Sequence, residues 1–293
     1  MNLSISVLAP ARIVAIGRNT FTELVRQKVF YFLLLFALLV IGNSAFVSKL
    51  SFQEEFQMLK DVALGAMSVF LCLLAILTTA MLLPRDLEDR TIFTILSKPV
   101  PRYEYLLGKL LGVLILLTLS ALIMGLFFIA VLLLWEQSVL AETQRSLVAS
   151  PQELATALAT VMKAAFSWDL IPAMAILLVK SVLLASLTLL ISTFATSGIF
   201  AILVATCAYF IGHLQVTARE YWMSGIGIHW WTRLFTAFLA LIFPDLQAFN
   251  LTDDIVAGVP LPLDIFWQTM ALGGVYAVVY YALACFLFQN REL

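Results

Sequence analysis

The sequence PRDLEDRTIFTILSKPVPRYEYLLGK, residues 84–109, is a charged segment between two long apolar runs. Its first residue, Pro84, is suited to the first turn of a helix, and acidic side chains follow where the positive end of the helix dipole favours them. Pro99 disfavours helical geometry at the residue before it, and a second proline two positions later prevents an early restart. The segment therefore predicts a short helix that ends near Ser97 and a second helix that begins at about Arg102.

The composition of the chain indicates an integral membrane protein. Of its 293 residues, 62% are hydrophobic and 12% are charged, and the mean hydropathy is +1.02. A soluble core could not bury so much apolar surface. The formal net charge is −1 and the basic residues are scattered, which argues against nucleic-acid binding. The three cysteines lie inside apolar runs, as buried thiols do, rather than in a disulfide or metal-binding pattern.

Uncharged runs long enough to cross a hydrocarbon core of about 30 Å predict the fold. We expect an all-α integral membrane protein with six transmembrane helices that form a single domain over residues 1–293. The predicted spans are residues 29–48, 62–84, 106–134, 170–192, 197–216 and 265–288.

The segments between the spans have distinct characters. Residues 11–28 mix apolar and basic side chains, which predicts an interfacial elbow helix, with a frayed cytoplasmic tail as the alternative. Residues 85–105 connect the second and third spans, and residues 135–169 form a polar loop on the far side. The far-side segment 217–264 contains residues 234–244, an apolar stretch that is too short to cross and predicts a re-entrant or interfacial helix before the last span.

The distribution of basic residues predicts the orientation. Of the 17 Lys and Arg residues, 10 lie in the N-terminal segment, in residues 84–109 and in the C-terminal tail, and 6 lie on the other side. Because Lys and Arg favour the cytoplasm, both termini and the central loop, residues 85–105, are predicted to be cytoplasmic. The remaining basic residue, Lys180, falls within the fourth span. Such a charge usually faces the bundle interior or a water-filled cavity, so Lys180 is a candidate for a translocation pathway. The alternatives are that its side chain snorkels to the interface or that the fourth span is shifted along the sequence.

Motifs for chemistry are mostly absent from the sequence. Gly108 and Lys109 lack the upstream glycine and the following Ser or Thr of a phosphate-binding loop, so ATP must be handled elsewhere if it is used. His213 and His229 are far apart and have no ligand-forming residues at metal-site spacing. We therefore expect no catalytic residue, cofactor or metal in this chain. A membrane enzyme could draw only on far-side carboxylates, namely Asp245, Asp253, Asp254 and Asp264.

The central loop resembles the cytoplasmic loop of ABC-2 type transporter permeases, in which a separate ATPase subunit grips a coupling helix. The resemblance rests on Glu88, Arg90, Thr91, the LSKPV run at residues 96–100, Arg102, Gly108 and Lys109. It extends weakly to the start, residues 18–28, and to the final residues 288–293. Arg90 stands where many members have glycine. The variant that the chain most resembles is the permease associated with copper-enzyme maturation, although the chain's own residues give no support for copper handling.

The resemblance implies the function. It makes the chain the permease subunit of an ABC transporter, an exporter, in the cytoplasmic membrane of a bacterium. A second permease chain would complete a dimer, and two copies of a P-loop ATPase subunit would bind ATP and magnesium. The alternative is a polytopic scaffold or membrane enzyme without an ATPase. By resemblance, ATPase coupling is assigned to Glu88, Arg90, Thr91, Leu96, Ser97, Lys98, Pro99 and Arg102.

Overall fold

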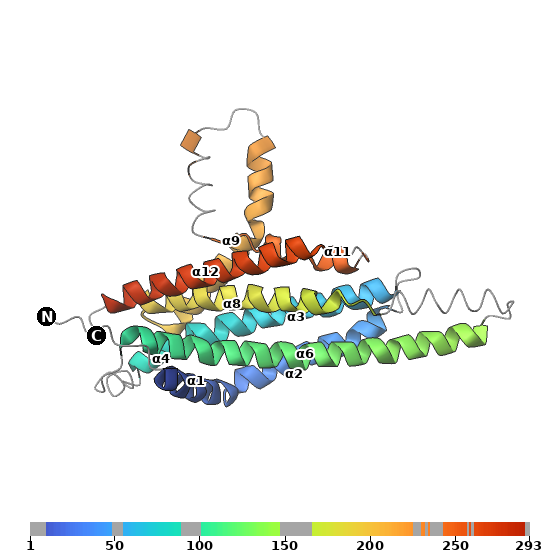
Figure 1. Cartoon of the computed structure of the whole chain (residues 1–293), viewed down its shortest axis with the longest axis horizontal. Helices are drawn as coiled ribbons and strands as arrows, with labels where there is room; N and C mark the ends of the chain where they lie inside the picture. The colour runs from blue at the N-terminus through green and yellow to red at the C-terminus, as the bar shows by residue number, and fades with distance from the viewer. Residues whose placement is uncertain are drawn as a thin grey trace.

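The computed structural model describes residues 10–48, 55–88, 101–146, 166–224, 230, 231, 234, 243–256, 258 and 261–290. All regular elements in these ranges are helices, and six of the helical segments are long and apolar enough to cross a membrane (Figure 1). The predicted fold class, an all-α membrane protein with six spans, is therefore confirmed. The elements are α1 (Pro10–Val25), α2 (Lys28–Ser48), α3 (Glu55–Ala80), α4 (Leu82–Glu88), α6 (Arg102–Ser146), α8 (Leu170–Phe194), α9 (Gly198–Ser224), the 3-10 helix η1 (Gln247–Phe249), α11 (Thr252–Val256) and α12 (Leu263–Gln289).

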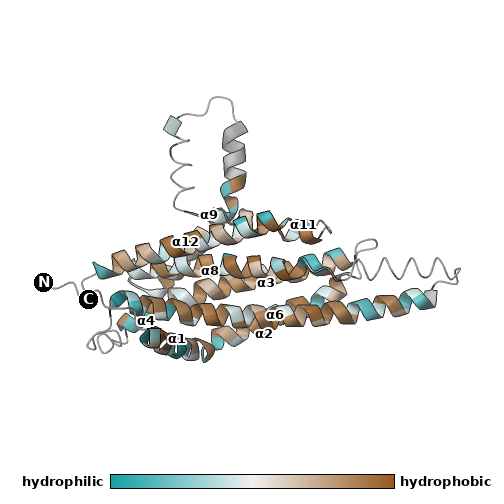
Figure 2. Ribbon diagram, viewed as in Figure 1, coloured by the Kyte–Doolittle hydropathy of each residue, from teal (hydrophilic) through white to brown (hydrophobic). Residues whose placement is uncertain are grey.

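Helices α3 and α8 form the centre of the bundle. Both are mostly buried, whereas only 22% of the apolar stretch of α2, of α9 and of α12 is buried. Helix α8 packs against α3, α6, α9 and α12, and α2 packs against α3. Apolar residues fill the middle of the helices, and hydrophilic residues gather toward their ends (Figure 2). The exposed apolar faces of the outer helices are what a protein surrounded by lipid requires.

Two contacts show that α3 and α8 run parallel in a constant register. The Lys180 ammonium lies 3.4 Å from the Ser68 hydroxyl, and the Ser192 hydroxyl donates to the Ala80 carbonyl at 3.5 Å. The two residues of each pair are separated by the same distance in sequence, |i−j| = 112. The relative positions of these two central helices are therefore kept over several turns.

A break at Met81 separates α3 from α4. It lies just before Pro84, which has no N–H to donate to the Ala80 carbonyl and whose ring would crowd that carbonyl in a continuous helix. The Ser192 hydroxyl of α8 bonds to this same carbonyl. Pro84 itself lies in the first turn of α4, where its missing N–H costs nothing. The predicted second span, 62–84, is thus two helices rather than one.

Two helices continue beyond the predicted ends of their spans. Helix α6 passes the predicted limit at Leu134 and runs to Ser146, a length of 45 residues or about 68 Å. Part of the predicted loop 135–169 is therefore helical, because residues 135–146 contain no Gly or Pro to stop the helix. Helix α9 continues past residue 216 to Ser224, and its C-terminal part extends away from the bundle (Figure 1).

The far-side segment before α12 is only partly described. Residues 235–242, which make up most of the predicted re-entrant helix 234–244, lie outside the described residues. After them come η1 and α11, in the part of the segment that carries the far-side carboxylates Asp245 and Asp254. Phe249 of η1 is fully buried and lies against Gly273 of α12, which ties this segment to the bundle.

Candidate coupling site at one end of the bundle

The central loop leaves and enters the bundle at an end where several helices converge. Helix α4 leads into residues 89–100, which lie outside the described residues, and α6 begins after them at Arg102. Helix α1 and the C-terminal end of α12 lie at this same end (Figure 1). The charged side chains of α1, α4 and α6, together with the C-terminal end of α12, form the candidate site.

Helices α1 and α6 cross in close contact because glycines line their crossing. A Cβ atom added to Gly108 would lie 2.6 Å from Ile16 Cβ, and one added to Gly112 would lie 2.8 Å from the Gly17 carbonyl oxygen. A Cβ on Gly17 would lie 2.6 Å from Leu111 Cδ2. Real Cβ atoms do not approach their neighbours so closely, so this packing requires glycine at residues 108 and 112, whereas a side chain at Gly17 would displace the end of Leu111. Small residues allow helices within membranes to pack closely in the same manner.

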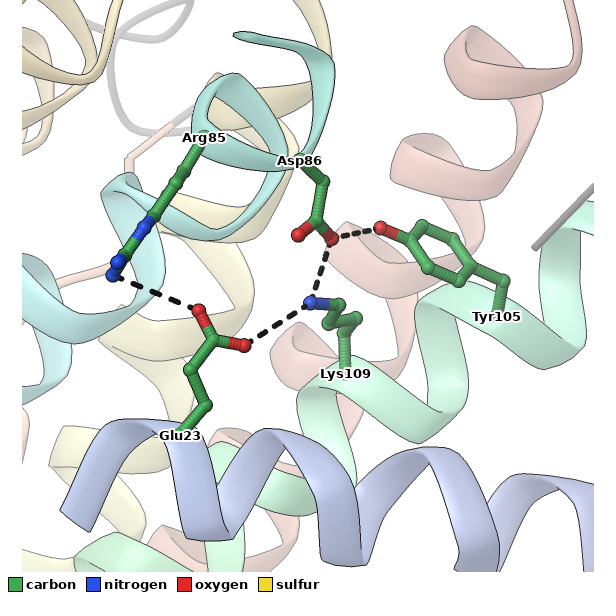
Figure 3. Close-up of polar contacts among 5 residues, drawn as sticks. All are labelled: Glu23, Arg85, Asp86, Tyr105 and Lys109. Carbon is green, nitrogen blue, oxygen red and sulfur yellow. Dashed lines mark hydrogen bonds and ion pairs between the residues drawn. The ribbon is translucent and has the colours of Figure 1, made fainter. Parts of the chain in front are cut away.

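A buried ion pair joins α4 to α6 (Figure 3). Lys109 Nζ lies 2.6 Å from Asp86 Oδ2, and the Tyr105 hydroxyl donates to the same carboxylate oxygen. Lys109 and Asp86 are 3% and 7% exposed. A buried pair does not by itself indicate high stability, but removing one partner leaves an uncompensated charge and costs about 3–5 kcal/mol. The pair therefore fixes where α4 sits relative to α6.

Glu23 of α1 makes two longer contacts in the same cluster (Figure 3). One oxygen lies 3.9 Å from Lys109 Nζ, and the other lies 3.6 Å from Arg85 Nη1. Charge-assisted hydrogen bonds are about 2.7–2.9 Å long, so both contacts are loose. We call Glu23, Arg85, Asp86, Tyr105 and Lys109 the ion cluster; it brings together side chains of α1, α4 and α6.

The first turn of α6 is also bound to the end of α12. Arg102 Nη1 donates to the Phe288 and Gln289 carbonyls, both at 2.9 Å, and its guanidinium lies 5.8 Å from the centre of the Phe288 ring. The last carbonyls of a helix have no partner within the helix, so a cation is favoured there. The Tyr281 hydroxyl of α12 donates to the Tyr103 carbonyl at 2.8 Å. The exit of the central loop is thus held by α12.

The structure describes two of the eight residues predicted for ATPase coupling. Glu88 is exposed at the end of α4, and Arg102 begins α6 and contacts α12. The other six lie outside the described residues: Arg90, Thr91, Leu96, Ser97, Lys98 and Pro99.

The sequence did not identify the ion cluster as a unit. Asp86 is one of the acidic residues at the predicted start of a helix, and Lys109 is one of the residues in which the loop resembles that of the permeases. The sequence offers one signal for their pairing: they carry opposite charges, and they lie near the ends of two successive spans that face the central loop. No sequence signal indicated that Glu23 would join them.

Lys180, the second predicted site, lies inside the bundle. Its side chain is 1% exposed, and its Nζ lies 3.2 Å from His213 Nε2 in addition to the contact with Ser68. His213 Nδ1 lies 3.4 Å from the Tyr209 carbonyl, so a proton on Nδ1 leaves Nε2 free to accept from Lys180. Sequence reasoning missed His213 as a partner, because it is on another helix. A role for Lys180 in translocation stays a prediction.

Within the described ranges, no group of three or more His, Cys, Asp or Glu residues could hold a metal ion.

Comparison with known proteins gives one family. Among curated proteins, none matches the chain significantly. The family described as "ABC-2 family transporter protein" matches residues 14–293, which is almost the whole chain. The chain therefore belongs to the ABC-2 family, and it is a multi-pass membrane subunit of an ABC transporter.

Proposed function

We propose that the chain is the permease subunit of an ABC exporter and that a separate ATPase subunit docks on its central loop. Two copies of the chain, or this chain and a related permease, enclose the pathway, as closed symmetry favours. Two ATPase subunits bind ATP and magnesium. The loop and both termini face the cytoplasm, and the membrane is the cytoplasmic membrane of a bacterium. The substrate is unidentified.

The observation that carries this proposal is that both ends of the central loop are attached to the bundle. At the entrance, Asp86 of α4 is bound to Lys109 and Tyr105 of α6. At the exit, Arg102 is bound to the end of α12. A force applied to the loop is therefore transmitted to several spans, as a coupling element requires.

The proposed docking surface is formed by the residues assigned to coupling in the sequence. Glu88 is exposed at the end of α4, where a partner can contact it. An exposed single charge contributes little to folding, at most about 1 kcal/mol, so Glu88 is free to serve a partner instead. We further propose that Lys180 faces the translocation pathway when the bundle changes conformation.

Copurification tests the proposal against its alternative. A pull-down of the chain from native membranes is expected to bring a soluble P-loop ATPase, and the purified chain alone is expected not to hydrolyse ATP. Hydrolysis should appear in the complex and should be lost when the catalytic residues of the ATPase are changed. Hydrolysis by the isolated chain, or repeated pull-downs without any ATPase, would favour a scaffold or a membrane enzyme.

A further inference from the structure

Lys109 lies between two carboxylates on different helices, at unequal distances. Its Nζ is 2.6 Å from Asp86 of α4 and 3.9 Å from Glu23 of α1. The Lys109 side chain is 4% exposed, so water cannot readily replace either carboxylate. A shift of about 1 Å would bring Lys109 to charge-assisted bonding distance from Glu23.

The two helices that carry these carboxylates are attached to α6 in different ways. Helix α1 is held against α6 along the glycine-lined crossing and by the pair Arg12–Glu104, at 3.7 Å. Glu23 and Lys109 are therefore parts of one packed unit. Helix α4 has only seven residues and follows the break at Met81. An open pocket of about 450 Å³ lies along the end of α1 and reaches Arg85 of α4; it is lined by Asn19, Thr22, Glu23, Arg26, Gln27 and Arg85.

The charges are divided evenly between these two parts. Helix α4 carries one cation and one anion of the ion cluster, Arg85 and Asp86. The α1–α6 unit carries the other two, Glu23 and Lys109. If α4 moves away, Arg85 leaves Glu23 at the moment when Asp86 leaves Lys109. Glu23 then remains beside Lys109 within the α1–α6 unit, while Arg85 and Asp86 move away together with α4.

We propose that Glu23 is a positioning residue that receives Lys109 when α4 withdraws Asp86 from the cluster. Glu23 lowers the free energy of the state in which α4 is displaced, because that state would otherwise contain a buried lysine without a counter-ion. Because α4 leads into the proposed docking loop, this role of Glu23 rests on the proposed function. It adds that α4 moves relative to a fixed α1–α6 unit during the transport cycle.

Hydrogen exchange of the α4 amides tests the role of Glu23 in the full chain, purified into lipid nanodiscs. The variant Glu23→Gln removes the second carboxylate but keeps the side-chain shape. We expect α4 to exchange more slowly than in the wild type, by about tenfold, which corresponds to about 1.4 kcal/mol. If Glu23 only held α4 in place through its contact with Arg85, the same variant would make α4 exchange faster. The proposal and this alternative therefore predict opposite changes in the exchange rate of the α4 amides.

Two further variants isolate the effect. Arg18→Gln removes an exposed charge of α1 without touching Lys109, and it should leave α4 exchange unchanged. In an Arg85→Gln background, Glu23 acts on the cluster through Lys109 alone, and the slowing caused by Glu23→Gln should persist. Faster or unchanged α4 exchange in Glu23→Gln would overturn the proposal.

The same measurement separates this inference from the proposed function. It uses the chain without an ATPase, so a failed copurification does not affect its result. In a complex with the ATPase, Glu23→Gln should lower kcat for ATP hydrolysis and leave the KM for ATP and subunit association unchanged. Slowed α4 exchange with normal kcat would refute the role of α4 displacement in the cycle while leaving the docking of an ATPase intact.

Discussion

Lys109→Met is expected to destabilise the folded chain by about 3–5 kcal/mol, because it removes the ammonium that pairs with the buried Asp86 carboxylate. The two charged atoms are 2.6 Å apart and both residues are less than 10% exposed, so water cannot take the place of the ammonium. The Tyr105 hydroxyl still bonds to the carboxylate, but it does not neutralise the charge. Reversible unfolding in mixed detergent micelles, followed by circular dichroism, would measure the loss.

A double replacement provides the matched control for this prediction. In Asp86→Leu/Lys109→Met the pair is exchanged for apolar side chains, and buried pairs replaced in this way often lose little or no stability. We expect the free energy of unfolding of the double variant to lie within about 1 kcal/mol of the wild-type value. The loss is then much smaller than the sum of the losses in the two single variants. If Lys109→Met cost less than about 1 kcal/mol, the pair would behave like an exposed one, and its role in fixing α4 would be refuted.

Three other predictions concern docking, orientation and the buried lysine. Glu88→Lys should leave the amount of protein in the membrane normal but weaken ATPase association and abolish transport, with Glu88→Gln milder, because like charges at an interface can cost several kcal/mol; full ATPase binding by Glu88→Lys in a pull-down would remove Glu88 from the docking surface. Single cysteines at Ser97 and Gln144 in a cysteine-free background should react with an impermeant maleimide from opposite sides of the membrane, and labelling from one side would contradict the six-span orientation. Lys180→Met should alter transport while subunit association, measured by pull-down, stays normal; unchanged transport would show that Lys180 has a purely structural role.

The spans could be predicted because membrane insertion depends on properties that are local in the sequence. A run such as residues 29–48 must be apolar throughout to lie in lipid, and α2 covers it. Helix ends are less local. Helix α6 passes Leu134 because the polar residues that follow are acceptable in a helix outside the membrane. The change from apolar to polar residues indicates where the membrane-spanning part of the helix ends. It does not indicate where the helix itself ends.

The ion cluster depends on tertiary packing and could be predicted only in part. Asp86 and Lys109 stand near the ends of successive spans, so their proximity follows from the up-and-down order of the helices. The position of Glu23 depends on how α1 packs against α6, which three glycines on two helices determine together. Lys180 was similarly predicted to be inside the bundle, but its partner His213 depends on where α9 crosses α8.

The length of α6 links the two faces of the membrane mechanically. One uninterrupted helix begins beside the central loop at Arg102 and reaches Ser146, beyond the ends of the neighbouring helices (Figure 1). For a rod of about 68 Å that pivots near its middle, a tilt of about 10° displaces each tip by roughly 6 Å. Since α1 is packed along its first turns, α6 can convert a small rotation at the end that carries the central loop into a displacement several atoms wide on the opposite side of the bilayer.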